Sequence, residues 1–387
     1  MITMFEADFI VYCSLRRMGG RVRSHGHEST AFHCRPRNDV VQLNEQGIHA
    51  AARFIHNRLQ TESYTPVPGV HIHSTSSLLN PTRRRPLTRA CLDWIFVISS
   101  LNFRVPDRYG VEWRTAWGSK ERKVHTGYWA LVAAMDRAIE EGIPITDPEF
   151  YSSSTECPDE VIEHVFRPAA QCSETIPLLK ERINILRENG HILCKHYGGS
   201  FQGFCDAFLR KYNSKGTSLQ LVQLVVDTFP SFRDEAVLEG QKVCFWKRPQ
   251  ILVAETWAAF FPEHGSPHPL FPADAAISQL TMFADYRVPQ ILHHLRILDY
   301  PPALVKNSDE ISIRAASIVA VERVRQDILR LQAPSNGRAG TDGEVSNVLI
   351  DFYLWDLAKR IEGGEDVVKD IDTNDPLPIH RTRSIWY

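Results

Sequence analysis

The chain has 387 residues, with 44 basic and 46 acidic side chains and a formal net charge of −2 at pH 7. This balance argues against a protein whose binding is dominated by nucleic-acid phosphates, because such proteins carry clustered basic charge. No apolar run approaches the roughly 18–20 residues of a membrane span, and the eight cysteines are spread singly, as is typical of a reducing compartment. We therefore expect a cytoplasmic protein that makes no contact with a membrane.

Residues 1–37 are expected to form a flexible leader, because they are rich in arginine and show little hydrophobic periodicity. A mitochondrial-type transit peptide is the alternative, but no convincing amphipathic helix is present. The histidine pairs His25/His27 and His71/His73 lack further ligands at zinc spacing, so no metal site is predicted. No sharp change of composition marks a linker further along the chain, and residues 38–387 are expected to form a single domain.

Hydrophobic periodicity predicts a mainly α-helical fold. Helices are expected at residues 47–59, 126–141, 176–189, 219–229, 249–257, 311–331 and 345–361. Ser173 is the expected cap of the third helix and Gly190 its end, while Thr217 or Ser218 is expected to cap the fourth. The region around residues 102–125 suits a small β-hairpin or irregular lobe, and it is the only place where appreciable strand is expected.

Residues 90–129 contain a dense aromatic block. Its members are Trp94, Phe96, Phe103, Tyr109, Trp113, Trp117, Tyr128 and Trp129. Such residues can be ordinary core. They can also hold planar bases by stacking, which stabilises binding by roughly 1–3 kcal/mol per base.

Asp285 is expected on a short connector between two helices. Apolar residues with helical spacing flank it: Leu280, Phe283 and Ala284 before it, and Val288, Ile291 and Leu292 after it. Pro289 favours a helix start there, because it pushes the preceding residue out of the α region and needs no N–H partner in the first turn. A carboxylate at a helix N-terminus is stabilised. Asp285 could therefore simply cap the helix, or it could be a catalyst.

Asp234 lies on another predicted connector, and like Asp285 it stands next to an arginine and an aromatic residue. Two carboxylates that face one cleft can cleave a glycosidic bond, one stabilising the cationic sugar and the other handling a proton or water. Lys247 and Arg248 precede Pro249 at a helix start, where they could bind a phosphate or remain solvated charges. The motifs GxGxxG, GxxxxGK[ST], GxSxG and HExxH are absent, which disfavours nucleotide-driven, serine-hydrolase and zinc-peptidase chemistry.

A series of separated motifs between about residue 38 and the C-terminus resembles the queuosine salvage family. They are Trp94-Ile-Phe-Val, Leu101-Asn-Phe103, Thr126-Gly-Tyr-Trp-Ala-Leu131, Glu141-Gly-Ile-Pro-Ile-Thr146, Phe229-Pro-Ser-Phe-Arg-Asp234, Phe245-Trp-Lys-Arg248, Ile251-Leu-Val-Ala254, Thr281-Met-Phe-Ala-Asp-Tyr-Arg287, Val288-Pro-Gln290, Tyr353-Leu-Trp355 and Ile379-His-Arg381. Residues 61–89 depart from the family pattern.

The resemblance implies a multi-helical fold related to DNA glycosylases and hydrolysis of the N-glycosidic bond of queuosine 5′-monophosphate. The base queuine would be released for reinsertion into tRNA. The catalytic role falls to Asp285, with Asp234 as second acid or alternative. The expected substrate-binding residues are Asn102, Phe103, Trp129, Arg233, Lys247, Arg248, Tyr286, Arg287, His380 and Arg381.

The expected partners are queuosine 5′-monophosphate and water, with no cofactor, no metal and no direct nucleic acid, and the protein is expected to be a monomer. Two alternatives of other classes stay open. One is a non-catalytic binding protein for a modified nucleobase or tRNA. The other is a base-excision DNA glycosylase, which would need a basic groove.

Overall fold

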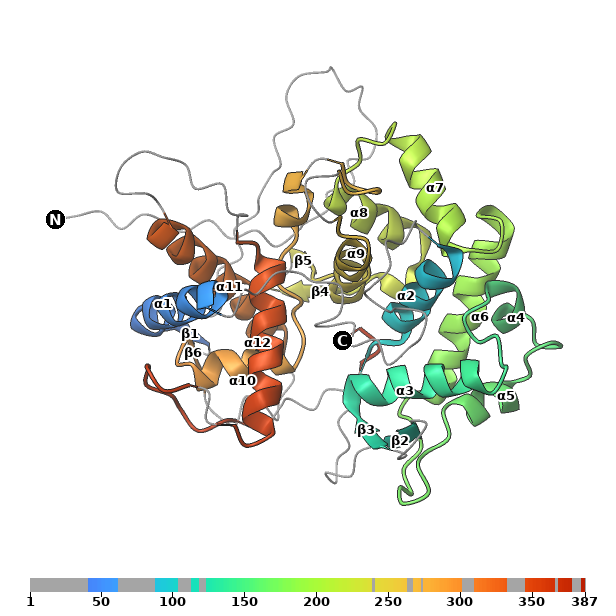
Figure 1. The fold of residues 1–387 in the computed structure, drawn as a ribbon, viewed down its shortest axis with the longest axis horizontal. Helices are drawn as coiled ribbons and strands as arrows, with labels where there is room; N and C mark the ends of the chain where they lie inside the picture. Colours follow the sequence, from blue (N-terminus) through green and yellow to red (C-terminus); the bar gives the residue numbers. More distant parts are fainter. Residues whose placement is uncertain are drawn as a thin grey trace. The chain divides into compact units, whose positions relative to one another are not determined.

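The computed structural model describes residues 41–61, 88–103, 113–117, 123–238, 241–262, 267–272, 274–300, 310–332, 345–365, 368–377 and 384–386 (Figure 1). Its helices are α1 (Glu45–Thr61), α2 (Arg89–Leu101), α3 (Gly127–Glu140), α4 (Pro148–Ser152), α5 (Asp159–Val165), α6 (Leu179–His196), α7 (Phe201–Lys211), α8 (Ser218–Thr228), α9 (Lys247–Ala259), α10 (Arg287–His294), α11 (Glu310–Gln332) and α12 (Asn347–Glu362), with the 3₁₀ turns η2 (Pro230–Phe232) and η3 (Asp274–Gln279). The mainly α-helical prediction is confirmed. The kinship to DNA glycosylases stays a prediction.

Three antiparallel strand pairs accompany these helices. They are β1 (Gln42–Leu43) with β6 (Leu298–Asp299), β2 (Arg114–Trp117) with β3 (Lys123–Thr126), and β4 (Glu235–Leu238) with β5 (Gln241–Cys244). The β2–β3 pair confirms the hairpin expected around residues 102–125. The expectation that appreciable strand occurs only there is wrong, because β4 and β5 form a second hairpin. Four-residue strands are too short for their alternation to be distinguished from a helical pattern.

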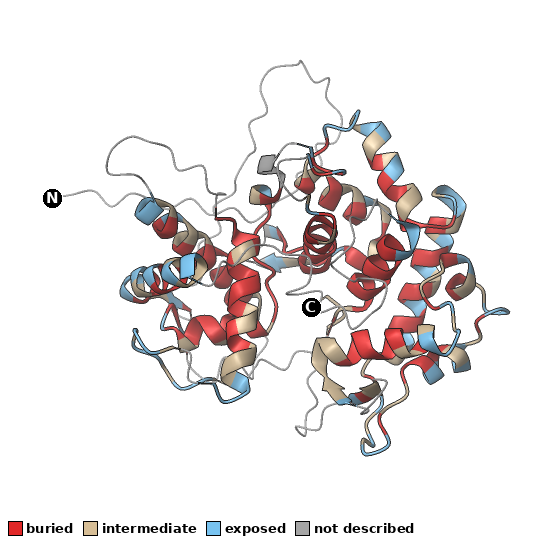
Figure 2. Ribbon diagram, viewed as in Figure 1, coloured by how far each residue is buried: buried red, intermediate tan, exposed pale blue. Residues whose placement is uncertain are grey.

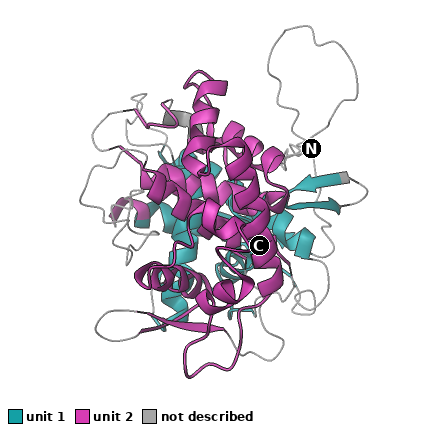
Figure 3. Ribbon diagram, turned by 90° about the vertical axis from the view of Figure 1, so that its right-hand side faces the viewer, with its two compact units in different colours: residues 1–58, 234–245, 282–379 teal, residues 59–233, 246–281, 380–387 magenta. Residues whose placement is uncertain are grey.

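The described helices fall into two compact units, which Figure 3 colours separately. Unit 1 comprises residues 1–58, 234–245 and 282–379, and unit 2 comprises residues 59–233, 246–281 and 380–387. The expectation of one domain over residues 38–387 stays a prediction, and residues 1–37 lie outside the part of the chain that the structure describes. Within that part, no helix is long and apolar enough to cross a membrane.

The core of unit 2 is built around α2 and α9, which are buried along almost their whole length (Figure 2). Because these two helices are buried on nearly every side, their polar side chains need hydrogen-bond partners within the protein. Phe96 on α2 stacks on Phe201 with ring centroids 4.8 Å apart and also contacts Phe229 at 5.0 Å. This part of the aromatic block is therefore ordinary core.

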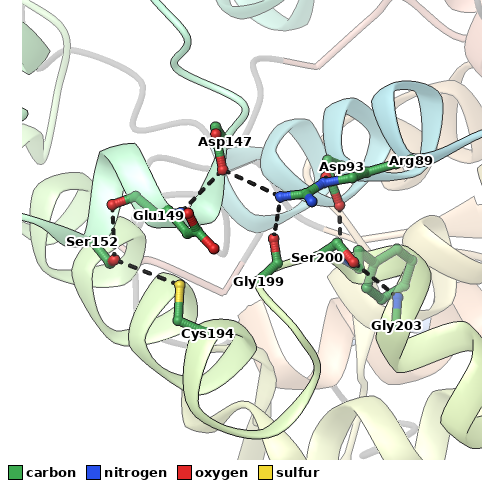
Figure 4. A network of polar contacts seen from close by, with 10 residues as sticks. Arg89, Asp93, Asp147, Glu149, Ser152, Cys194, Gly199, Ser200 and Gly203 are labelled. Atoms are coloured by element: carbon green, nitrogen blue, oxygen red, sulfur yellow. Dashed lines mark hydrogen bonds and ion pairs between the residues drawn. The ribbon is translucent and has the colours of Figure 1, made fainter.

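A polar network fixes the N-terminal end of α2 (Figure 4). Asp93 is buried, and its Oδ1 accepts the N–H of Phe201 at 2.6 Å, at the start of α7. Arg89 donates to Asp93 at 3.3 Å and to the carbonyl of Gly199 at 2.8 Å. Burial raises the pKa of Asp93 to about 6. The network therefore ties α2 to the α6–α7 connection with a carboxylate that titrates near neutral pH.

The helix expected at residues 176–189 is displaced in the structure. It begins at Leu179, so Ser173 does not cap it, and it continues through Gly190 to His196. Gly190 lies against α4, where an added Cβ would come within 2.7 Å of both Tyr151 and Ser152. The glycine is therefore required for close helix packing rather than for a helix end.

Candidate active site

The segment that precedes Asp285 has no regular secondary structure, so the helix expected over residues 280–284 is wrong. The 3₁₀ turn η3 ends at Gln279, and regular helix resumes only at Arg287. In place of helical hydrogen bonds, the backbone of this segment binds buried side chains. The contacts are Thr281 N to Gln250 Oε1 at 2.9 Å, Phe283 N to Asp351 Oδ1 at 2.9 Å and Ala284 O to Arg314 Nε at 2.7 Å.

Asp285 itself is 7% exposed and caps the start of α10. Its Oδ1 accepts the backbone N–H groups of Arg287 at 2.8 Å and Val288 at 2.9 Å, which confirms the helix-cap interpretation. No donor among the described residues binds Oδ2. Oδ1 is thus held by the N-terminus of α10, whereas Oδ2 remains available to interact with a ligand.

Asp234 forms a buried ion pair with Arg314 in unit 1. Arg314 Nη1 donates to Oδ1 at 3.0 Å and Nη2 to Oδ2 at 2.5 Å, and both residues are at most 3% exposed. The Arg314 guanidinium also lies 4.0 Å from the ring centroid of Phe245. Since both oxygens of Asp234 accept from Arg314, this carboxylate is less available to a substrate than that of Asp285.

The other two predicted residues of unit 1, Tyr286 and Arg287, follow the aspartate directly. Arg287 is buried, and its Nη1 donates to Glu362 at 3.3 Å. Its guanidinium lies 5.9 Å from the centroid of the half-buried Tyr286 ring. Arg287 Nε is buried and has no hydrogen-bond partner within the described structure. The structure therefore places one buried cation within two residues of Asp285.

In unit 2, Lys247 and Arg248 occupy the first turn of α9, as predicted, and both are buried. Lys247 Nζ donates to the carbonyl of Asn102 at 3.3 Å, and Arg248 donates to the carbonyls of Ser100 and Ser231. The structure thus brings these cations to the C-terminal end of α2, where backbone carbonyls carry partial negative charge.

Arg182 on α6 joins this group, although nothing in the local sequence distinguishes it from the other charged residues of that helix. It donates to the carbonyls of Leu101 and Phe103, both at 2.7 Å. Burial, together with the positive charge of Arg248, lowers the pKa of Arg182 to about 9. Three buried cations therefore surround the end of α2.

Phe103 is 4% exposed and lies among these cations. The guanidinium carbons of Arg182 and Arg248 are 4.1 Å and 5.2 Å from its ring centroid. Trp129, by contrast, is half-buried, as is Asn102, and the side-chain amide of Asn102 makes no hydrogen bond within the described ranges. Trp129 and Asn102 are therefore better placed than Phe103 to meet a ligand.

The remaining predicted substrate-binding residues are Arg233, His380 and Arg381. Arg233 is exposed and donates to the carbonyls of Val226 at 3.0 Å and Asp227 at 3.1 Å, at the end of α8. His380 and Arg381 lie outside the described residues. Within the described ranges, no group of three or more His, Cys, Asp or Glu side chains is placed to hold a metal ion.

Glu255, on α9, is a buried acid that the sequence did not reveal. Tyr128 Oη donates to its carboxylate at 3.3 Å and Ser99 Oγ at 3.5 Å. Burial raises the pKa of Glu255 to about 7. Glu255 directly follows the apolar run Ile251-Leu-Val-Ala254. The sequence alone did not single it out, because acidic residues of helices usually face the solvent.

Comparisons with known proteins agree on one family. A family model described as queuosine salvage protein matches residues 80–387. Proteins named queuosine 5′-phosphate N-glycosylase/hydrolase are similar along most of the chain. The one from Mus musculus is 38% identical, covering 93% of this chain and 98% of the relative. That from Schizosaccharomyces pombe is 37% identical, covering 90% and 96%. That from the bacterium Sphaerobacter thermophilus is 36% identical, covering 77% and 82%.

Proposed function

The chain belongs to the queuosine salvage protein family, and on this basis we propose that it hydrolyses the N-glycosidic bond of queuosine 5′-monophosphate. The products are queuine, available for reinsertion into tRNA, and ribose 5-phosphate. The assignment of residues rests mainly on the two carboxylate oxygens of Asp285. Two backbone N–H groups donate to Oδ1, and no donor among the described residues binds Oδ2.

The base sets a particular chemical demand. Queuine is a 7-deazaguanine, so the purine N7 that could be protonated to help the base leave is a carbon. Hydrolysis must depend instead on stabilising the oxocarbenium-like sugar and on hydrogen bonds to the departing base. A carboxylate held in a fixed position can stabilise the oxocarbenium-like sugar, because its negative charge is already oriented when the positive charge develops.

We assign to Asp285 the stabilisation of this cation and the orientation of water. As the bond from C1′ to the base nitrogen breaks, its electron pair leaves with the base, and the water oxygen bonds to C1′. The water gives a proton to the carboxylate, and the base nitrogen takes up a proton from solvent. The carboxylate then releases its proton to solvent, which completes the hydrolysis. Asp234 is the alternative acid, but its bidentate pairing with Arg314 supports Asp285 as the reacting carboxylate.

The cations of α9 are our proposed phosphate ligands. Lys247 and Arg248 lie in the first turn of α9, where their side-chain charges and the positive end of the helix dipole favour an anion. Arg248 is also committed to two backbone carbonyls, so Lys247 is the better supported of the two. For the base, we propose stacking on Trp129 and hydrogen bonds to the Asn102 amide. Tyr286, Arg287, Arg233, His380 and Arg381 stay as further proposed contacts. For the buried Phe103 we propose a role in stability instead of substrate binding.

We also propose that the protein works in the cytoplasm as a monomer, without cofactor and without binding nucleic acid. The direct test is incubation with queuosine 5′-monophosphate, followed by chromatography for free queuine. Release of queuine with turnover supports the enzyme. Tight binding of the nucleotide with no release of base would support a non-catalytic binding protein, and release of bases from DNA would support a DNA glycosylase.

A further inference from the structure

We propose that Arg314 and Asp234 position Asp285 for catalysis by holding the carbonyl of Ala284. This inference rests on the proposed function, in which Asp285 is the reacting carboxylate. Arg314 itself does not contact the substrate in this account. It acts through the backbone of the residue that precedes the catalyst, and Asp234 acts by fixing the guanidinium.

The geometry of Arg314 leaves it little freedom. Its Nε donates to Ala284 O at 2.7 Å, while Nη1 and Nη2 donate to the two oxygens of Asp234 at 3.0 and 2.5 Å. The planar guanidinium of Arg314 thus forms a bidentate contact with Asp234 and one hydrogen bond with the carbonyl of Ala284. Rotating the guanidinium would break charge-assisted bonds in a buried environment, where their loss is costly.

Both ends of the contact are also anchored. The ring of Phe245 lies 4.0 Å from the guanidinium carbon, and the backbone N–H of Phe245 donates to the carbonyl of Asp234 at 3.0 Å. Asp234 and Arg314 are 2% and 3% exposed. All these residues belong to unit 1, as does Asp285. The clamp is therefore part of the same compact unit as the carboxylate that it is proposed to hold.

Within the described structure, the hydrogen bonds that hold Asp285 in position all involve the backbone. Its carboxylate accepts hydrogen bonds from the backbone at 287 and 288, downstream, and no side chain among the described residues binds it. Upstream, the peptide that joins Ala284 to Asp285 is held by Arg314, and Phe283 N is held by Asp351. Because a displacement near 1 Å can reduce a rate by about a hundredfold, loss of the upstream contact should affect turnover.

The test uses Arg314→Lys, which keeps the buried positive charge beside Asp234. A lysine ammonium cannot bind both carboxylate oxygens and the Ala284 carbonyl in the planar geometry of the arginine. We expect kcat for queuosine 5′-monophosphate to fall by about 10- to 100-fold, while KM changes by less than about threefold. Asp234→Asn should act in the same direction, and it serves if Arg314→Lys does not fold.

A matched control is Arg187→Lys. Arg187 also combines backbone carbonyls with a carboxylate, because it binds the carbonyls of Tyr151 and Ser153 and the side chain of Asp159. It lies in unit 2 and has no role in the proposed chemistry. We expect this control to lower the melting temperature without lowering kcat. A similar loss of kcat in both variants would show a general effect of weaker packing and would overturn the proposal.

A double-mutant cycle with Asp285→Asn separates positioning from independent action. If Arg314 acts through Asp285, kcat of the double variant should equal that of Asp285→Asn within about threefold. Losses that multiply would overturn the positioning role, as would wild-type kcat in a folded Arg314→Lys variant. In either case Asp285→Asn would still be slow, so the proposed function would stand. Full turnover in Asp285→Asn would instead overturn the assignment of the catalyst, and the positioning role with it.

Discussion

Lys247 Nζ donates to the backbone carbonyl of Asn102 at 3.3 Å, which joins the first turn of α9 to the residue that ends α2. If Lys247 binds the 5′-phosphate, Lys247→Gln should raise KM for the nucleotide by about 10- to 100-fold, as expected for loss of a hydrogen bond to a charged group. Steady-state kinetics on queuosine 5′-monophosphate and on queuosine provide the measurement.

The control for that prediction is Lys195→Gln, which removes an exposed lysine from the last turn of α6. It should leave both KM values unchanged. The phosphate assignment is contradicted if wild-type protein cleaves queuosine as efficiently as its 5′-phosphate, or if Lys247→Gln affects the two substrates equally.

Asn102 and Trp129 should differ in what they contribute to base recognition. Stacking is indifferent to base identity, so Trp129→Ala should weaken binding of queuosine and guanosine monophosphates alike, by roughly 1–3 kcal/mol. Asn102→Ala should instead reduce the preference between the two nucleotides, because an unpaired group costs about 1–3 kcal/mol only for the ligand that used it. Competition binding measures both. An equal loss for both nucleotides in Asn102→Ala would show that another residue reads the base.

Phe103 is expected to act on stability rather than on affinity. Its ring is buried against Arg182 and Arg248, so Phe103→Ala should lower the free energy of unfolding by about 3–5 kcal/mol. Urea titration gives this value, and the affinity of the folded variant for the nucleotide should stay within about threefold of wild type. A variant with unchanged stability and weakened binding would restore Phe103 as a stacking residue.

Asp93 makes stability depend on pH. Its pKa in the folded protein is about 6, against 3.8 for an ordinary aspartate, so folding takes up a proton between these values. The contribution of Asp93 to stability is therefore fully present below pH 3.8 and is lost as the pH rises through 6. Asp93→Asn keeps an oxygen to accept the N–H of Phe201 and cannot ionise.

The expected result is a stability difference that changes with pH. The change in unfolding free energy caused by Asp93→Asn should be more favourable at pH 7.5 than at pH 4.5 by about 2 kcal/mol, as the pKa shift predicts between these two pH values. Urea unfolding at the two pH values gives the difference, with the exposed Asp206→Asn on α7 as the control. A difference that does not vary with pH would contradict the role of burial at Asp93.

The sequence predicted those helices whose signals are local. The expected helix at residues 219–229 is α8, Ser218–Thr228, with Thr217 in a capping box, and the helix expected at 345–361 is α12, Asn347–Glu362. Their apolar stripes and caps lie within the segments themselves.

Features that depend on distant residues could not be predicted in this way. Residues 280–284 have helical spacing, but their backbone groups are bound by Gln250, Arg314 and Asp351, which lie between 30 and 68 residues away along the chain. Arg314 and Glu255 look like ordinary polar positions of helices, because their partners appear only in three dimensions. The position of Asp285 next to the start of a helix could be predicted, because Pro289 is a sequence signal for a helix N-terminus.

Asp285→Asn tests the central claim most directly. The amide keeps the volume of the side chain and an oxygen for the N–H groups of Arg287 and Val288, but it loses the charge that stabilises the ribosyl cation. Queuine release from queuosine 5′-monophosphate, measured by chromatography at saturating substrate, should fall by at least about a hundredfold, with the melting temperature nearly unchanged. Normal turnover in this variant, with a clearly lowered melting temperature, would contradict the account and show that Asp285 only caps α10.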